Sequence, residues 1–265
     1  VMVTAYDFAG AKAADRAGVD MVLVGDSGAQ VVLGYERTAR VTVDEMLMLS
    51  GAVRRGVQKA FMVCDLPFGS TEVSDAQAIE TAVRFVREAG ADAVKLEGGN
   101  PDRLSRIRAI VGAGVPVVAH LGLTPQTATM LGGLRAQGRT VESARKLVTE
   151  AVAVEEAGAC ALVIEAVPSE VAAVVTPKLT IPVIGIGAGP ADGQVLVMHD
   201  LLGVTEGKLP TFVKQFSNLG EEITTAIQAY AAEVRTGAFP GQEHQYKSTP
   251  DAVAAAQAAA SELGR

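Results

Sequence analysis

The sequence contains few of the residues that mark nucleic-acid-binding or membrane-spanning proteins. It has no tryptophan, and aromatic residues make up only 4% of its 265 positions, so it offers no aromatic platform on which bases could stack. Its formal net charge of −7 provides no basic surface for a phosphate backbone. No uninterrupted apolar run reaches the roughly 18 residues that a membrane helix needs. We therefore expect neither nucleic acid nor a membrane as a partner.

Cysteine is also scarce, because only Cys64 and Cys160 occur, each in an apolar stretch. The two have neither the spacing of a zinc site nor that of a redox motif. We interpret both as reduced packing residues of a cytoplasmic protein, since disulfides are rare in that compartment. The opening residues, "VMVTAYD", lack the basic segment of a secretory signal and are typical of a strand. Because no initiator methionine precedes them, we expect a native N-terminal segment to be missing.

Short apolar runs alternate with segments of helical periodicity along most of the chain, which is typical of repeated βα units. The candidate strands lie at 1–6, 21–26, 61–66, 93–97, 116–121, 161–166, 182–187 and 194–199. The candidate helices between them lie at 8–17, 43–55, 75–89, 102–112, 140–157 and 169–177. Eight strands separated in this way predict an α/β fold, the (β/α)8 TIM barrel, for which about 250 residues are typical.

The chain shows no internal repeat and no low-complexity linker, so we predict one catalytic barrel domain over 1–240. Its last helix is predicted over 211–235. Residues 241–265 are predicted as a C-terminal helical extension or tail, with an alanine-rich helix over 250–263. Several predicted helices end on glycine just before the next strand, as in "DRAGVD" and "REAGAD", where glycine supplies a left-handed C-cap.

Polar residues stand at the carboxyl ends of the predicted strands, the edge at which parallel barrels carry their active sites. In chain order they are Asp26 and Ser27, Asp65, Lys95 and Glu97, His120, and Glu165. In the stretch "AVKLEGG", Lys95 and Glu97 are two positions apart, so the period of a strand directs both away from the face of Val94 and Leu96.

Each of these residues has an ordinary structural explanation as well. An aspartate at a strand end is often a helix cap, His120 suits a hydrogen-bonded core histidine, and Lys95 with Glu97 suits a buried ion pair. However, Asp26, Asp65 and Glu97 come from three successive strands and would converge on one point. Three adjacent carboxylates repel one another unless a cation lies among them.

A hard cation such as Mg²⁺ would relieve this repulsion, because it binds a few carboxylates and keeps positions for waters and a substrate oxygen. Lys95 would then neutralise a substrate carboxylate or a developing enolate. Glu165, from a strand farther round the barrel, is available as a general base.

Two glycine-rich stretches are further candidates. Residues 185–193, "GIGAGPADG", resemble a phosphate-binding loop on a late strand, although glycine there also permits a tight turn between strand and helix. Residues 131–139, "LGGLRAQGR", are predicted as a long loop after the fifth strand and are a candidate lid.

The ordered motifs "VTAYD", "VGDS", "DLPFGS", "VKLEGG", "AHLGLTPQ", "QGR", "IEAVP" and "IPVIGIGAG" together resemble the ketopantoate hydroxymethyltransferase family, from Val1 to about residue 240. The resemblance implies a transferase with a Mg²⁺-dependent (β/α)8 barrel of the phosphoenolpyruvate/pyruvate-barrel group. The family transfers a hydroxymethyl group from 5,10-methylenetetrahydrofolate, its co-substrate, to 3-methyl-2-oxobutanoate through a metal-stabilised enolate. The product is 2-dehydropantoate, a precursor of pantothenate and coenzyme A.

Carried over motif by motif, the resemblance implies a set of roles. The metal ligands would be Asp26, Asp65 and Glu97. The contacts to the 2-oxo acid would be Asp26, Ser27, Asp65 and Lys95, and His120 would line the same pocket. Glu165 would be the proton acceptor. The resemblance also implies a cytoplasmic homo-oligomer, with a decamer as the candidate. The "GAGPADGQV" loop departs from the family pattern, because it is a residue shorter and lacks a cysteine.

Two other functions fit the same residues. One is a Mg²⁺-dependent lyase or mutase of the same barrel group, which acts on a small 2-oxo acid and needs no folate. The other is a barrel without catalytic activity whose carboxylates bind a structural ion, in which case Glu165 would be dispensable.

Overall fold

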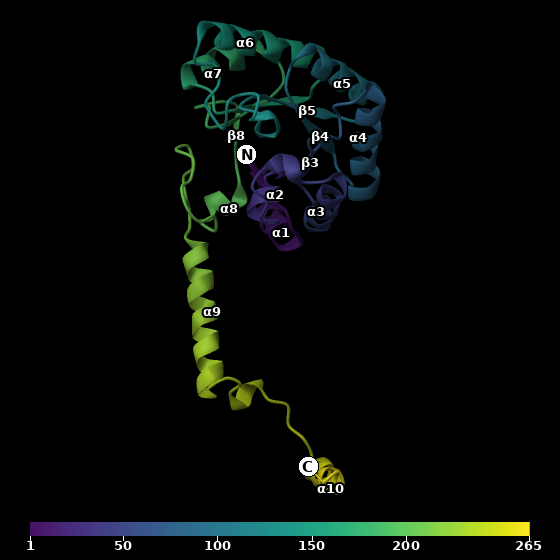
Figure 1. Ribbon diagram of the computed structural model, residues 1–265, viewed down its shortest axis with the longest axis vertical. Coiled ribbons are helices and arrows are strands. Elements are labelled where there is room, and N and C mark those ends of the chain that lie inside the picture. The colour runs from purple at the N-terminus through teal and green to yellow at the C-terminus, as the bar shows by residue number, and fades with distance from the viewer. Residues whose placement is uncertain (265) are drawn as a thin grey trace. The chain divides into compact units, whose positions relative to one another are not determined.

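The computed structural model describes residues 1–264, and its strands form a closed parallel barrel (Figure 1). Their order round the barrel follows the chain, and the last strand pairs with the first. The strands are β1 Met2–Thr4, β2 Met21–Val24, β3 Phe61–Asp65, β4 Ala93–Glu97, β5 Val117–Gly122, β6 Ala161–Glu165, β7 Val183–Ile186 and β8 Gly193–Leu196. The predicted (β/α)8 fold is thus confirmed.

Helices α3 to α7 lie on the outside of these strands (Figure 1). The α-helices of the described chain are α1 Phe8–Ala17, α2 Gly28–Val31, α3 Val43–Gly56, α4 Asp75–Ala89, α5 Pro101–Gly112, α6 Val141–Glu156, α7 Ser169–Val175, α8 Met198–Leu201, α9 Leu219–Thr236 and α10 Pro250–Glu262. The six helices predicted between strands are all present. The two four-residue helices, α2 and α8, are too short to leave a periodic signal in the sequence.

Local signals account for where the helices begin and end. The side chain of Asp7 accepts a hydrogen bond from the backbone N–H of Gly10 at 2.6 Å and so caps α1. At the start of α3, Thr42 and Glu45 satisfy each other's backbone N–H groups in a reciprocal capping box. Gly18 and Gly90 end α1 and α4 in the left-handed conformation, as the sequence predicted.

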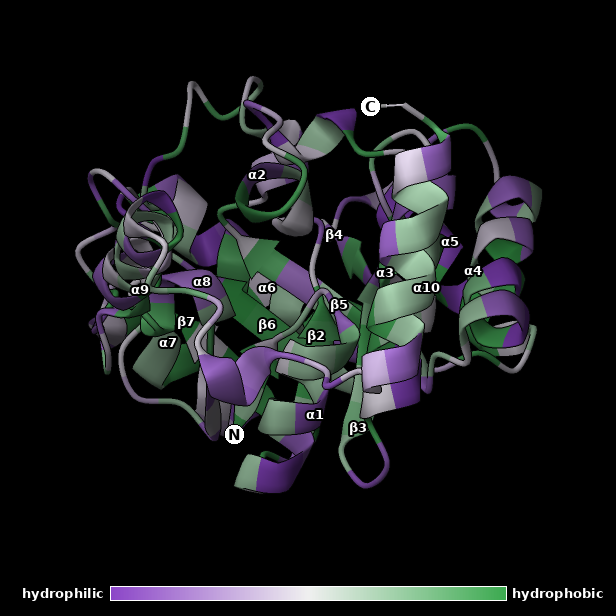
Figure 2. Ribbon diagram, turned by 90° about the horizontal axis from the view of Figure 1, so that it is seen from below, coloured by the Kyte–Doolittle hydropathy of each residue, from purple (hydrophilic) through white to green (hydrophobic). Residues whose placement is uncertain are grey.

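The two faces of the strands serve two hydrophobic clusters. Outward-facing residues such as Val94 and Leu96 pack against the helices in the larger cluster. Inward-facing residues fill the inside of the barrel, namely Met2, Leu23, Val63, Ala93, Val118, Ala161, Val163, Ile184 and Val195. The strands are accordingly hydrophobic along most of their length (Figure 2). The inner cluster supports the polar side chains at the carboxyl ends of the strands.

The eighth unit differs from the expectation. β8 ends at Leu196 rather than at 199, because Met198–Leu201 turn into α8, where the backbone N–H of Met198 donates to Thr4 Oγ1 at 2.8 Å. Only a loop joins β7 to β8, and β1 is limited to Met2–Thr4.

The described chain consists of two compact units, Val1–Ser217 and a second that begins at Asn218. The sequence analysis placed the division between 240 and 241, whereas the structure places it between Ser217 and Asn218. The difference is α9, which belongs to the second unit. The helix predicted over 211–235 begins only at Leu219, since the preceding residues turn and the backbone N–H of Phe216 donates to the carbonyl of Leu201 at 2.8 Å. No helix within residues 1–264 combines the length and hydrophobicity needed to cross a bilayer.

Candidate active site

A cavity of about 860 Å³ lies at the carboxyl ends of the strands. All the site residues predicted from the sequence line it: Asp26, Ser27, Asp65, Lys95, Glu97, His120 and Glu165. They come from the ends of five strands, β2 to β6, so the barrel joins groups that are far apart along the chain.

Strand register explains why these side chains point the same way. Asp65 stands beside Lys95 on β3 and β4, and Glu97 stands beside His120 on β4 and β5. Residues paired in this way on parallel strands project to the same face, which here is the inside of the barrel. The expectation that Lys95 and Glu97 share a face opposite their apolar neighbours is therefore met.

Lys95 is a buried cation with two polar partners. Its Nζ lies 3.1 Å from Asp65 Oδ1 and 3.1 Å from His120 Nδ1, and the residue is only 4% exposed. Burial alone would lower the pKa of Lys95, but nearby carboxylates, Asp65 first, outweigh it and raise the pKa. The ion pair of Lys95 is thus with Asp65 on the neighbouring strand, rather than with Glu97.

The carboxylates outnumber the single ammonium. Asp65 Oδ2 accepts a hydrogen bond from the backbone N–H of Asp26 at 2.9 Å, which sets the two residues side by side. Burial first, and then the negative charges of Asp65 and Glu97, raise the pKa of Asp26 to about 8. Burial also raises the pKa of Asp65. A further positive charge would therefore stabilise the ionised forms of these buried carboxylates.

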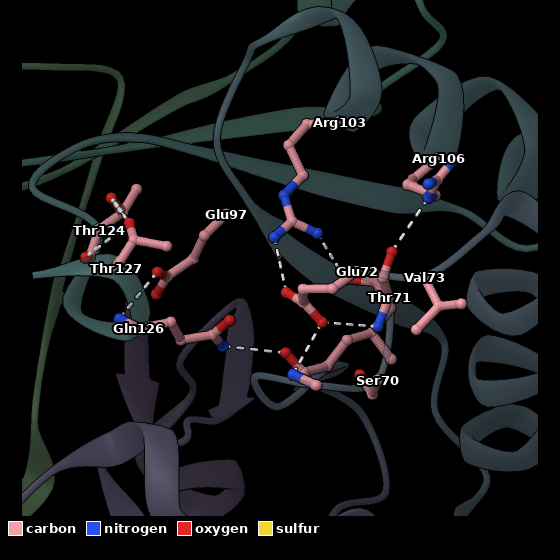
Figure 3. A network of polar contacts seen from close by, with 12 residues as sticks. Ser70, Thr71, Glu72, Val73, Glu97, Arg103, Arg106, Thr124, Gln126 and Thr127 are labelled. Atoms are coloured by element: carbon pink, nitrogen blue, oxygen red, sulfur yellow. Dashed lines mark hydrogen bonds and ion pairs between the residues drawn. The ribbon is translucent and has the colours of Figure 1, made fainter. Parts of the chain in front are cut away.

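Gln126 joins two of these carboxylates, and the sequence analysis assigned it no role. It lies in a 3₁₀ turn, Pro125–Thr127, after β5. Its side-chain Nε2 donates to Asp26 Oδ2 and to the carbonyl of Leu66, both at 2.9 Å. Its backbone N–H donates to Glu97 Oε2 at 3.1 Å (Figure 3). The only signal in the sequence was its place at the end of the "AHLGLTPQ" motif.

The segment after Asp65 is held by a second polar network. Arg103 of α5 donates to Glu72 Oε1 at 2.6 Å and to Thr71 Oγ1 at 2.8 Å (Figure 3). The other carboxylate oxygen of Glu72 accepts from the backbone N–H of Gly69 at 2.7 Å. This network fixes the "DLPFGS" segment, and with it the Leu66 carbonyl that Gln126 contacts.

His120 lies between two carboxylates. Its Nε2 is 3.1 Å from Glu165 Oε2 and its Nδ1 is 3.4 Å from Glu97 Oε1, both within ion-pair distance, although the Nε2 contact lacks the alignment of a hydrogen bond. Burial and the Lys95 ammonium lower the pKa of His120, but its contacts with Glu165 and Glu97 outweigh them and raise it to about 9. His120 is therefore a buried core histidine that also lines the cavity.

Glu165 ends β6 at a strained point of the backbone. The next residue, Ala166, has a φ of 48° and is the only non-glycine residue of 1–264 with a positive φ. On β5, Gly122 has a φ of 91°, and a Cβ there would overlap the carbonyl oxygen of Glu165. Strain of this kind persists where the surrounding structure holds it, commonly at functional positions.

Ser27 has a partner that the sequence analysis did not identify. The hydroxyl groups of Tyr6 and Ser27 lie 2.8 Å apart. Burial raises the pKa of Tyr6, so its phenol remains protonated at neutral pH. Tyr6 belongs to the "VTAYD" motif, which was the available signal.

The fit of a metal ion can be tested on these oxygens. Within residues 1–264, no three His, Cys, Asp or Glu side chains are grouped so as to hold one metal ion. Asp65 Oδ1 is nevertheless buried with only the ion pair to Lys95 and no aligned hydrogen bond, and the pocket has an excess of carboxylate. Mg²⁺ commonly uses one or two carboxylates and keeps several waters. The residues fit such an ion, whereas a preformed set of three direct ligands is not present.

The glycine-rich stretch 185–193 has a packing explanation. Gly187 and Gly189 have φ values of 63° and 73°, and a Cβ on either would overlap Phe212 or Ser169, respectively. These glycines thus permit close contact between segments. In the 131–139 loop, Leu134, Arg135 and Ala136 line the cavity.

The two cysteines differ from each other. Cys64 is buried, and burial raises its pKa to about 12, which agrees with a packing role. Cys160 is an exposed free thiol, so its interpretation as a packing residue was wrong. It stands between the end of α6 and the start of β6, at the surface of the described chain.

Solved structures with a similar fold define the class of barrel. Phosphoenolpyruvate phosphomutase from Streptomyces platensis subsp. rosaceus matches with a TM-score of 0.61 and 18% identity, covering 89% of this chain and 83% of that one. 2,3-Dimethylmalate lyase, a member of the PEP mutase/isocitrate lyase superfamily, matches with a TM-score of 0.58 and 16% identity, covering 100% and 91%. These similarities show that the chain shares the (β/α)8 barrel fold of those enzymes.

Sequence relatives define the family. The model of the ketopantoate hydroxymethyltransferase family matches residues 1–242. The 3-methyl-2-oxobutanoate hydroxymethyltransferase of Alkaliphilus metalliredigens is 51% identical over 245 residues, or 92% of this chain and 86% of that protein. The enzyme of the same name from Rhodococcus jostii is 53% identical over 247 residues, or 92% and 84%. The chain belongs to the ketopantoate hydroxymethyltransferase family, and it is a transferase.

Proposed function

We propose that this protein transfers a hydroxymethyl group from 5,10-methylenetetrahydrofolate to 3-methyl-2-oxobutanoate and forms 2-dehydropantoate, with Mg²⁺ as the metal. The observation that carries the proposal is the convergence of Lys95, three carboxylates and Glu165 in one cavity. This arrangement suits a 2-oxo acid that must lose a proton from the carbon next to its keto group. Lys95 can pair with the carboxylate of the acid, and Glu165 can accept the proton.

Each group has a role in this proposal. Asp26 and Asp65, with Glu97, would hold Mg²⁺, which supplies Lewis-acid stabilisation of the enolate charge. The buried ammonium of Lys95 pairs with the carboxylate of the 2-oxo acid and favours its anionic form. Ser27, whose Oγ lies 2.8 Å from the Tyr6 hydroxyl, orients the same substrate.

Glu165 removes the proton from C3 of the 2-oxo acid, and the electrons of that C–H bond pass into the enolate. Water adds to the one-carbon unit and its two C–N bonds to the folate break, which releases tetrahydrofolate and leaves the unit at the oxidation level of formaldehyde. The enolate carbon bonds to this carbon, and the alkoxide that forms takes up the proton held by Glu165. His120, with its Nε2 at 3.1 Å from Glu165 Oε2, holds the base in place and stabilises its charge before the transfer. Because Glu165 is only 16% exposed at its side chain, bulk water has limited access to it.

The alternative functions make different predictions. A mutase or lyase would need no folate; its support is the fold similarity, which at 18% and 16% identity extends to the fold alone. The relatives at 51% and 53% identity favour the hydroxymethyltransferase. A barrel without catalytic activity would tolerate loss of Glu165.

We further propose that the protein is a cytoplasmic homo-oligomer, with a decamer as the candidate. Support comes from α9, on which Ile223, Ile227, Tyr230 and Val234 recur at helical spacing and are each at least 45% exposed. An apolar stripe of this kind is typical of a contact between subunits. Light scattering after size exclusion tests the assembly, since Ile227→Asp should yield smaller species than the wild type.

The test of the activity is proton exchange at C3 of 3-methyl-2-oxobutanoate in D₂O, followed by NMR with and without Mg²⁺. We expect metal-dependent exchange without folate, its loss in Glu165→Gln, and formation of 2-dehydropantoate once methylenetetrahydrofolate is added. Glu156→Gln, at an exposed position on α6, is the matched control and should exchange as the wild type does. Absence of exchange in the Mg²⁺-loaded wild type would contradict the enolate mechanism.

A further inference from the structure

Tyr6 and Ser27 place a pair of hydroxyl groups at the wall of the cavity. Tyr6 follows β1 and Ser27 follows the neighbouring strand β2, and their hydroxyl oxygens lie 2.8 Å apart. Ser27 lines the cavity, whereas Tyr6 does not line it and is only 2% exposed. The phenol therefore lies behind the serine, one hydrogen bond away from the space that a ligand would occupy.

The two glycines that flank Asp26 and Ser27 make room for this pair. A Cβ on Gly25 would lie 2.7 Å from Ser27 Oγ, and a Cβ on Gly28 would lie 2.8 Å from Cδ1 of the Tyr6 ring. Both distances are much shorter than a van der Waals contact, so neither position has space for a methyl group. Neither glycine has a positive φ, so the reason for glycine here is the close approach of these two side chains.

The far side of Tyr6 is held by other elements. The hydroxyl of Thr4 on β1 accepts a hydrogen bond from the backbone N–H of Met198 at 2.8 Å. The Thr4 side chain lies near the phenol and lowers the pKa of Tyr6, but burial outweighs it and raises that pKa. The ring of Tyr6 contacts the ring of His199, with centroids 5.5 Å apart. Tyr6 is therefore a fixed phenol that keeps its proton at neutral pH.

The supply of protons sets the direction of the hydrogen bond between Tyr6 and Ser27. Without a bound acid, either oxygen can be the donor. The keto and carboxylate oxygens of a 2-oxo acid carry no proton, so a hydroxyl that binds them must donate. Ser27 has one hydroxyl proton, and when this proton goes to the acid, the serine oxygen is left to accept from Tyr6. Donation by the phenol also strengthens the serine as a donor, because hydrogen bonds in a chain polarise one another.

We propose that Tyr6 is a positioning residue for the 2-oxo acid, which donates its proton to Ser27 Oγ and so directs the Ser27 proton towards the substrate. This inference rests on the proposed function, which places the acid beside Ser27. Tyr6 acts through Ser27 and does not touch the acid itself. The space at Gly25 and Gly28 is what allows the two hydroxyl groups to meet in this orientation.

The test measures Mg²⁺-dependent C3–H exchange of 3-methyl-2-oxobutanoate at varied concentrations of the acid. We expect Tyr6→Phe to raise KM for the acid about threefold to tenfold, the effect of losing one hydrogen bond. The kcat for exchange should change less than about twofold, because Ser27 holds the acid equally before and during proton transfer. A loss confined to KM is the mark of a group that binds the acid without taking part in the proton transfer.

A double-mutant cycle separates positioning from a general packing defect. In Ser27→Ala the hydroxyl that Tyr6 directs is absent. Adding Tyr6→Phe to that variant should therefore leave KM within about twofold of the value for Ser27→Ala alone. A packing defect would instead raise KM in both backgrounds by the same factor.

Tyr35→Phe is the matched control. The hydroxyl of Tyr35 donates to Glu45 Oε1 at 2.5 Å, and Tyr35 does not line the cavity. The control therefore removes the same atom and one hydrogen bond away from Ser27. Both KM and kcat for exchange should stay at the wild-type values.

The outcomes are separable. A raised KM in Tyr6→Phe that disappears in the Ser27→Ala background supports the positioning role. An unchanged KM in Tyr6→Phe, or a rise that persists in the Ser27→Ala background, overturns this role and leaves the proposed function standing. Absence of exchange in the Mg²⁺-loaded wild type overturns the proposed function itself, and the positioning role with it.

Discussion

Gln126 is the residue whose replacement most directly tests how the site is held together. Its side chain donates to Asp26 Oδ2 and to the Leu66 carbonyl, while its backbone N–H contacts Glu97. Gln126→Leu removes the two side-chain hydrogen bonds and keeps the backbone contact. Leucine has a similar volume, so the change leaves two buried acceptors without a donor rather than a large void.

The magnitude follows from those two acceptors. A buried polar group that loses its partner costs about 1–3 kcal/mol, so the metal-free variant should unfold with about 2–5 kcal/mol less free energy. For a chain of this size, that lowers the thermal midpoint by about 5–15 °C. Because the carboxamide also fixes the orientation of the Asp26 carboxylate, Mg²⁺ affinity should fall about 10-fold to 100-fold, the usual effect of losing such a partner.

Urea unfolding of the metal-free protein measures the stability, and titration calorimetry measures Mg²⁺ binding. Gln137→Leu is the control, because within residues 1–264 the only hydrogen bond of its side chain is to the Arg135 carbonyl, at 2.9 Å. Unchanged or tighter Mg²⁺ binding in Gln126→Leu would refute the reasoning. The carboxamide would then compete with the metal for Asp26 instead of positioning it.

Three further predictions concern the same site. Gly122→Ala should lower the free energy of unfolding by about 3 kcal/mol in urea, because φ there is 91° and the new methyl group meets the Glu165 carbonyl; an unchanged midpoint would contradict this. In a chelator, stability should fall as pH rises from 5 to 7, since burial raises the pKa of Asp26 to about 8 and the folded chain then binds more protons than the unfolded one. Asp26→Asn should reduce that slope by about 1.4 kcal/mol per pH unit, and equal slopes in the two proteins would refute the assignment. Mg²⁺ at a thousand times its Kd should add about 4 kcal/mol to stability, reversibly with EDTA, and Asp65→Asn should lose this gain.

Much of the architecture was predictable because its signals are local. Alternating apolar runs and helical periods depend on residues a few positions apart, and so do the Thr42–Glu45 capping box and the glycine that ends α1. The period of two in β4 sets Lys95 and Glu97 on one face in any fold that pairs this strand. Hence the barrel class and the site residues at its strand ends could be inferred from the sequence alone.

Less local features required the folded chain. Gln126 and Asp26 are 100 positions apart, and only closure of the barrel brings them into contact. The partner of Lys95 is Asp65 because the register of β3 and β4 sets them side by side, and no pattern within β4 contains that register. The late start of α9 has the same origin, since the backbone N–H of Phe216 donates to the carbonyl of Leu201 instead of continuing a helix.

The sequence by itself determined the order of strands and helices and the chemical types available at each strand end. The tertiary structure decided which of those groups are neighbours, where Phe212 lies against Gly187, and how burial raises the pKa of Asp26. The physical reason is that backbone propensity and side-chain periodicity act over a few residues, whereas ion pairing, burial and register arise from contacts between distant segments.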